Sequence, residues 1–177
     1  SVAAQVINLV GTDEVHMTYS GERATNAGNY VASVIAVDNP NYTVMGGTNL
    51  SYEWKITKAT RVISGFPSEM EVTYGTNETI TFTYSGDDVE AEVTIGSVDI
   101  ATYTYTDGEN TGTIVLTGVN GGETRLGLAL RETQNYQYAS LECTVKVVAA
   151  TPELTFTPDS LAFTYGEEAK TVTYAYN

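Results

Sequence analysis

One phrase of this sequence occurs twice, and the second copy begins 91 residues after the first. The matched positions are Ala59, Thr60, Pro67, Thr73, Tyr74 and Gly75 in the first copy and Ala150, Thr151, Pro158, Thr164, Tyr165 and Gly166 in the second. After one residue of slippage, Thr79, Thr81 and Tyr84 correspond to Thr171, Thr173 and Tyr176. A repeat of this kind is typical of arrays of like domains, which supply reach and spacing rather than chemistry.

The repeat predicts three units: a first at 1–59, a second at 60–150, and the opening strands of a third at 151–177. Linkers between the units are essentially absent, so we expect a stiff rod rather than beads on a flexible string. The third unit holds 27 residues and the chain starts at Ser1 without a signal peptide. We therefore expect a piece of a longer, exported polypeptide.

Short stretches rich in Thr, Val and Tyr predict strands, and some of them, such as 50–57 and 89–95, alternate with a two-residue period. These stretches are 50–57, 89–95, 113–117, 126–130, 161–165 and 171–176. The stretch 30–37 is apolar on both faces and predicts a central strand. Gly, Asn and Asp mark turns at short spacing, and no stretch has a helical period. The sequence predicts an all-β protein of tandem antiparallel immunoglobulin-like β-sandwich domains.

The third segment holds too few strands to bury a core. We expect it to be disordered alone, or to pair with the exposed edge of a sheet. The first unit is short and could lack its opening strands. Addition of the C-terminal strands of one copy to the first unit of another is therefore one hypothesis for a partner, beside neighbouring repeats of the same polypeptide.

The chain is strongly acidic, with 8 basic against 22 acidic residues and a net charge of −14. This balance argues against binding nucleic acid and against docking on an anionic membrane, since both need clustered Lys and Arg. No apolar run approaches 18 residues, so we expect no direct insertion into a membrane. A self-repelling, solvated coat suits a secreted or cell-surface protein.

The sequence offers no constellation of catalytic residues, and we expect no enzyme activity. His16 is the only histidine and lies on a stretch that predicts an exposed strand. Cys143 is the only cysteine, and it falls on the apolar phase of a strand, which predicts a buried structural thiol.

Calcium is the one cofactor that the acidic loops suggest. Asp87 and Asp88 with Glu90, and Asp107 with Glu109, place oxygen donors in turns, which a hard cation prefers. The spacing matches no EF-hand, and acidic residues are also common in turns for conformational reasons. Both interpretations stay open.

Two pairs of tyrosines lie at alternate positions, where both rings of a pair share one face of a strand. They are Tyr103 with Tyr105, and Tyr136 with Tyr138. A flat aromatic surface could stack on the sugar rings of a glycan or form an adhesive patch on a host protein. The alternative is cross-strand packing within the sheet.

Several phrases resemble those of bacterial surface repeats. The first unit carries Asn26-Ala-Gly-Asn-Tyr30 and closes on Trp54-Lys-Ile-Thr-Lys-Ala59, which resembles repeats of the MBG or YGX type. The second unit, with Val72-Thr-Tyr-Gly75 and Thr117-Gly-Val-Asn-Gly-Gly122, resembles a bacterial immunoglobulin-like domain. The resemblance implies stalk or adhesin modules on a bacterial exterior, with no active site shared across the family.

The sequence thus predicts a non-enzymatic structural module of a secreted or cell-surface bacterial protein, as part of an adhesin, a filament or a surface layer. One alternative is an adhesin module that binds glycan or protein through exposed tyrosines. Another is a decoration or tail protein of a bacteriophage virion, since immunoglobulin-like domains also occur there.

Overall fold

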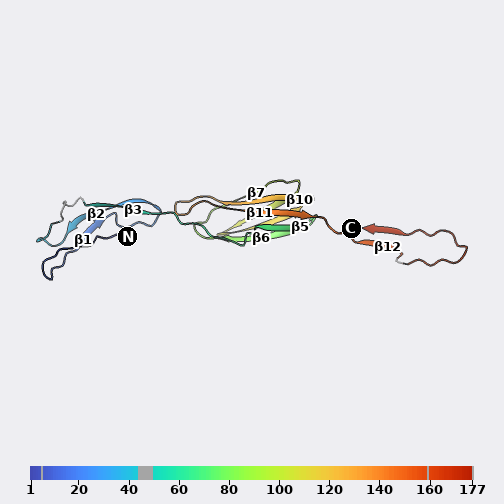
Figure 1. Cartoon of the computed structure of the whole chain (residues 1–177), viewed down its shortest axis with the longest axis horizontal. Helices are drawn as coiled ribbons and strands as arrows, with labels where there is room; N and C mark the ends of the chain where they lie inside the picture. Colours follow the sequence, from blue (N-terminus) through green and yellow to red (C-terminus); the bar gives the residue numbers. More distant parts are fainter. Residues whose placement is uncertain (5, 44–49, 159, 177) are drawn as a thin grey trace.

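The computed structural model describes residues 1–4, 6–43, 50–158 and 160–176, and every regular element among them is a strand. The all-β fold class is confirmed. The strands, in chain order, are β1 Met17–Ser20, β2 Gly28–Val37, β3 Ser51–Ile56, β4 Ile63–Ser64, β5 Glu69–Thr73, β6 Asn77–Tyr84, β7 Ala91–Ile95, β8 Ala101–Gly108, β9 Thr111–Gly118, β10 Gly122–Leu130, β11 Ala139–Val148, β12 Leu154–Thr157 and β13 Thr173–Tyr176. They form three groups that follow one another along the long axis (Figure 1).

The middle group is a β-sandwich of two four-stranded sheets, with strand orders β5-β11-β10-β7 and β4-β6-β9-β8. Alternate residues of each strand point into the space between the sheets. The largest fully buried side chains are Phe82, Ile114, Leu116, Leu126, Leu128, Leu130, Val72, Val145 and Cys143. The alternation in the sequence therefore has its expected cause, because one face of each sheet is in the core and the other is in water.

One pairing in the sandwich departs from the antiparallel pattern. β5, near the start of the unit, pairs in parallel with β11, its last strand, and Val72 and Val147 are register partners. Both of these valines are buried. The pairing joins residues that are 75 positions apart, such as Met70 and Val145, and so closes the unit on itself.

The N-terminal group differs from the predicted sandwich, because its described strands form one sheet of order β1-β2-β3. β2 is central, as predicted, but its outer face is not covered: Val31 and Ile35 are 52% and 51% exposed. The buried apolar residues described in this group are Ala27, Ala32 and Val34. Three short strands without a second sheet leave the first unit a much smaller core than the sandwich has.

The C-terminal group is a two-stranded sheet of β12 and β13, and its described residues between 151 and 175 are all exposed. The strand predicted at 171–176 is present in part as β13, whereas 161–165 forms no strand. That part of the prediction was wrong for a physical reason. The repeat matches 160–164 to β5, and the partner of β5 is the last strand of its unit, for which this segment has no counterpart.

Most other strand predictions are confirmed. The stretches 50–57, 89–95, 113–117 and 126–130 lie on β3, β7, β9 and β10. The division of the chain at residues 59 and 150 stays a prediction.

A matched pair of glycines tests the packing of the sandwich. A Cβ on Gly112 would lie 2.5 Å from the Phe82 ring and 2.8 Å from the Tyr105 ring, whereas a Cβ on Gly121 would meet only a carbonyl oxygen at 3.8 Å. We expect Gly112→Ala to lower the free energy of unfolding by about 1–3 kcal/mol, because the added methyl group would overpack the core. Gly121→Ala is the control, and urea denaturation is the measurement. Equal effects of the two substitutions would contradict this packing.

Candidate interface between the repeated units

The loop before β11 reaches from the second unit to the first and binds the turn before β2. The N–H of Ala27 donates to Oδ1 of Asn135 at 2.9 Å, and Nε2 of Gln134 donates to the carbonyl oxygen of Ala27 at 2.6 Å. Nδ2 of Asn135 also donates to Oδ1 of Asn26 at 3.3 Å. Both backbone groups of Ala27, which is 5% exposed, are therefore satisfied by side chains of the other unit.

The segment that joins the two units is bound to the same loop. The N–H of Ala59 donates to the carbonyl oxygen of Asn135 at 2.8 Å, and the N–H of Gln137 donates to the carbonyl oxygen of Ala59 at 2.9 Å. Nζ of Lys58 lies 2.5 Å from Oε1 of Glu132 and 2.7 Å from the carbonyl oxygen of Thr133. The connection is thus part of a short ladder rather than a free linker, which restricts bending between the units.

A second set of contacts fixes the shape of this loop. Oγ1 of Thr133 donates to Oδ2 of Asp87 at 2.6 Å and accepts from the backbone N–H of Tyr136 at 3.1 Å. The guanidinium of Arg61, a residue that is 5% exposed, lies 5.1 Å from the centre of the Tyr136 ring. Nη1 of Arg61 donates to the carbonyl oxygen of Asp87 at 2.8 Å. The arginine therefore stabilises the loop through cation–π and hydrogen-bond contacts.

Gly86 is required where it stands. Its φ is +104°, and a Cβ there would lie 2.7 Å from the ring of Tyr136. Only glycine combines this backbone conformation with a close approach to the ring that covers Arg61.

The four tyrosines predicted to bind glycan do not form one surface. The hydroxyl of Tyr103 donates to the carbonyl oxygen of Val93 at 2.6 Å, and the ring of Tyr105 stacks on Phe82 at 6.3 Å between centroids. The hydroxyl of Tyr105 also donates to Asp107. Burial of this hydroxyl raises the pKa of the phenol, and the hydrogen bond to Asp107 raises it further. Tyr136 faces Arg61, and Tyr138 is 58% exposed. Glycan binding stays a prediction.

The acidic residues predicted to bind calcium do not share hydrogen-bond partners. Asp87 accepts from Thr133, and Asp107 accepts from Tyr105. Asp88 accepts from the N–H of Asn110 at 3.0 Å and from the hydroxyl of Tyr84 at 2.9 Å. Glu90 and Glu109 are exposed.

Within the described residues, no group of three or more His, Cys, Asp or Glu could hold a metal ion. Calcium stays a prediction, and an unchanged melting temperature on adding EDTA would dispose of it.

Cys143 lies as the sequence predicted, whereas His16 is exposed as predicted but precedes β1 rather than lying on a strand. His16 is exposed, and its Nδ1 lies 2.9 Å from Oδ2 of Asp38. The backbone N–H of His16, together with its ring, lowers the pKa of the Asp38 carboxyl. Cys143 is fully buried, and burial raises the pKa of its thiol, which makes it a poor nucleophile.

Sequence reasoning missed the residues that join the units, chiefly Ala27, Lys58, Arg61, Gln134 and Asn135. It marked 26–28 as a turn and Asn135 as the start of a hairpin. Nothing in a single sequence indicates that these two turns meet, because they are 108 residues apart.

Comparison with known proteins gives distant likenesses. No protein-family profile matches the chain, and no curated protein matches it. The solved structures similar to it include the S-layer protein SbsC domains 4 and 5 (20% identity, TM-score 0.40), SbsC domains 4–9 (16%, 0.43) and SbsC domains 5–6 (19%, 0.41). They cover 67%, 73% and 55% of this chain. The chain in turn spans 65%, 20% and 49% of those structures, less than two thirds of each.

Removal of the Asn135 side chain tests the interface. Spin labels on cysteines that replace Thr18 and Thr102 report the distance between the two units. We expect Asn135→Ala to broaden the distribution of this distance, because the N–H of Ala27 loses its hydrogen-bond partner at a cost of about 1–3 kcal/mol. Both label positions are exposed, whereas Cys143 is buried and stays unlabelled.

The control is Asn29→Ala, an exposed position on β2 whose side chain has no hydrogen bond among the described residues. An equally narrow distribution in Asn135→Ala would show that the loop does not set the orientation of the units.

The hydrogen bonds to Asp88 predict a pH effect. The N–H of Asn110 and the Tyr84 hydroxyl lower the pKa of this carboxyl in the folded state. Its stabilising contribution is therefore complete above the unfolded pKa of about 3.9 and is lost as pH falls through the folded pKa. We expect Asp88→Asn to lower the melting temperature at pH 7 and the difference from the parent chain to shrink below about pH 4. Asp99→Asn, at an exposed turn, is the control.

Proposed function

We propose that this chain is a non-enzymatic structural module of a secreted or cell-surface bacterial protein, built of MBG/YGX-type and immunoglobulin-like repeats. In this role it holds other domains at a fixed distance and direction, as part of a stalk, a filament or a surface layer. The observation that carries the proposal is the contact of Gln134 and Asn135 with Ala27, which ties one repeated unit to the next.

Domains within one chain usually move relative to one another unless their interface is large and apolar. Here the restriction comes from polar contacts on two sides of the junction. Asn135 and Gln134 bind the turn at Ala27, while the strand-like bridge between Ala59 and Tyr136 holds the connection itself. A hinge motion would have to break both sets together, so the junction favours one orientation.

The surface chemistry suits a crowded, aqueous exterior. The net charge of −14 on 177 residues keeps copies soluble and disfavours non-specific contact with nucleic acid or anionic lipid. No helix among the described residues is long and apolar enough to cross a membrane. The tyrosine-based adhesin and the phage virion protein stay as alternatives, and no specific contact among the described residues favours either.

Small-angle X-ray scattering of the chain tests the mechanical part of this proposal. We expect one orientation of the first two units to fit the scattering, extrapolated to zero concentration, at low and at high salt, because hydrogen bonds rather than long-range charge fix their junction. Scattering that requires an ensemble of bent conformers would contradict it. Antibody labelling of intact producing cells tests the location, with labelling after lysis alone as the contrary outcome.

A further inference from the structure

The sheet of the first unit is the first sheet of the sandwich with one strand missing. Its order β1-β2-β3 corresponds to β7-β10-β11, and all of these pairings are antiparallel. Gly28 pairs with Ile56 at the same place in the ladder where Gly122 pairs with Val147. In the sandwich, β5 lies beyond β11. Among the described residues, nothing pairs with the corresponding edge of β3.

The C-terminal segment is a copy of the missing part. Leu154 pairs with Tyr176 in the β12–β13 hairpin, as Ile63 pairs with Tyr84 between β4 and β6, and the repeat relates these two pairs directly. Between the two strands lies 160–164, which the repeat matches to β5. This segment has the sequence of an edge strand, and no strand within the described part of the chain pairs with it.

The side chains that would enter a core from this segment are apolar and exposed. In the sandwich the inward positions of the opening strands are Ile63, Met70, Val72, Ile80 and Phe82, all of which pack in the core. The repeat matches them to Leu154, Leu161, Phe163, Val172 and Tyr174, which are 53%, 37%, 61%, 40% and 69% exposed. Five apolar side chains at positions that match core positions are therefore exposed and can pack against another apolar surface.

The first unit offers the complementary surface. Between its sheet and the N-terminal segment lies an apolar hollow of about 770 Å³, and its lining includes Met17, Tyr19, Ala32, Val34, Leu50 and Tyr52. Ala32 and Val34 correspond to Leu126 and Leu128, two of the fully buried core residues of the sandwich. The hollow thus lies on the face that the opening strands cover in the second unit.

We propose that residues 160–164 of a second copy of this chain add to the free edge of β3 in parallel, as β5 adds to β11, with Phe163 beside Ile56 as Val72 lies beside Val147 in the sandwich. This proposal rests on the proposed function and names the partner in the array. The donor and acceptor lie at opposite ends of the molecule (Figure 1), so the addition joins copies head to tail.

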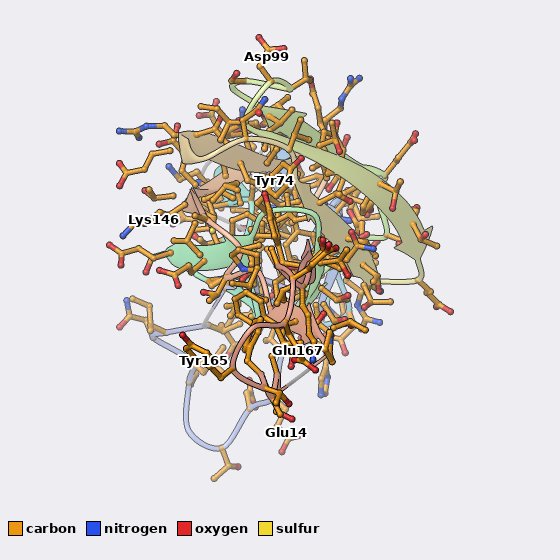
Figure 2. All side chains as sticks on the ribbon, turned by 90° about the vertical axis from the view of Figure 1, so that its right-hand side faces the viewer. Glu14, Tyr74, Asp99, Lys146, Tyr165 and Glu167 are labelled. Atoms are coloured by element: carbon orange, nitrogen blue, oxygen red, sulfur yellow. The ribbon has the colours of Figure 1, made fainter. Side chains whose placement is uncertain are left out.

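The register of the sandwich fixes the register of the complex. Lys146 pairs with Glu71 across the parallel ladder, and both residues are exposed. Figure 2, viewed along the long axis from the C-terminal side, shows Lys146 projecting outward from the sandwich and Tyr165 on the hairpin nearer the viewer. The repeat matches Lys146 to Lys55 and Glu71 to Ala162, so in the complex Lys55 of one copy lies opposite Ala162 of the other. Neighbouring strands of a sheet lie close enough for a disulfide at such a position.

Mixing two variants that each carry one added cysteine, with Cys143 buried in both, under oxidised glutathione tests the register. We expect Lys55→Cys and Ala162→Cys chains to form a disulfide-linked heterodimer. The control replaces Lys55→Cys with Thr18→Cys, an exposed position on β1 at the opposite edge of the same sheet. Equal trapping with Thr18→Cys, or no trapping with Lys55→Cys, would overturn the proposal.

A matched pair of substitutions tests the apolar contact. We expect Phe163→Asp to abolish trapping and the concentration-dependent increase in mass seen by analytical ultracentrifugation, because it places a carboxylate in an apolar site. Tyr165→Asp is the control, since its counterpart Tyr74 is 53% exposed in the sandwich. Both side chains are exposed in the single chain, so neither substitution alters its folding.

A parent chain that stays monomeric at all concentrations would overturn strand addition. The structural role would still stand if the two units keep one orientation in that monomer, so the two failures are distinguishable.

Discussion

The closure of the sandwich depends on the parallel pairing of β5 with β11. This pairing brings the start and the end of the unit together and places Val72 against Val147 in the core. Forming this pairing costs conformational entropy, because it closes a chain segment about 75 residues long. The contacts of the completed sandwich offset that cost. A segment that holds only the opening strands, or only the closing strands, therefore cannot close. Among the described residues, neither the C-terminal segment nor the first unit has such a pairing, and the first is exposed while the second has one incompletely covered sheet.

The same strand order explains how one unit is oriented on the next. The loop that leads into β11 must turn back toward the preceding unit, and Thr133 and Arg61 hold it in that shape. Because the loop is rigid, Asn135 can satisfy a buried backbone N–H of the neighbouring unit with little further loss of entropy. The core of the sandwich and the direction of the array are thus linked through a few polar groups in one loop.

Much of the architecture could be predicted from local patterns. The alternation in 126–130 and the apolar phase of Cys143 require only that one strand face be buried, which holds wherever the strand pairs. The strand expected at 161–165 failed because its local pattern is right but its partner strand has no counterpart in the segment. Period two places Tyr103 and Tyr105 on one face, and only the tertiary structure shows that this face packs against the core.

The repeat carries the head-to-tail model one step further. Asn41 stands in the first unit where Asn135 stands in the second, and the turn at Asn120 and Gly121 corresponds to that at Asn26 and Ala27. If the C-terminal segment of one copy and the first unit of the next form a composite unit, Asn41 is placed to accept a hydrogen bond from the N–H of Gly121 in the preceding sandwich. The contact between copies then repeats the contact within the chain, so one geometry at every junction yields a straight or regularly twisted filament rather than an irregular aggregate.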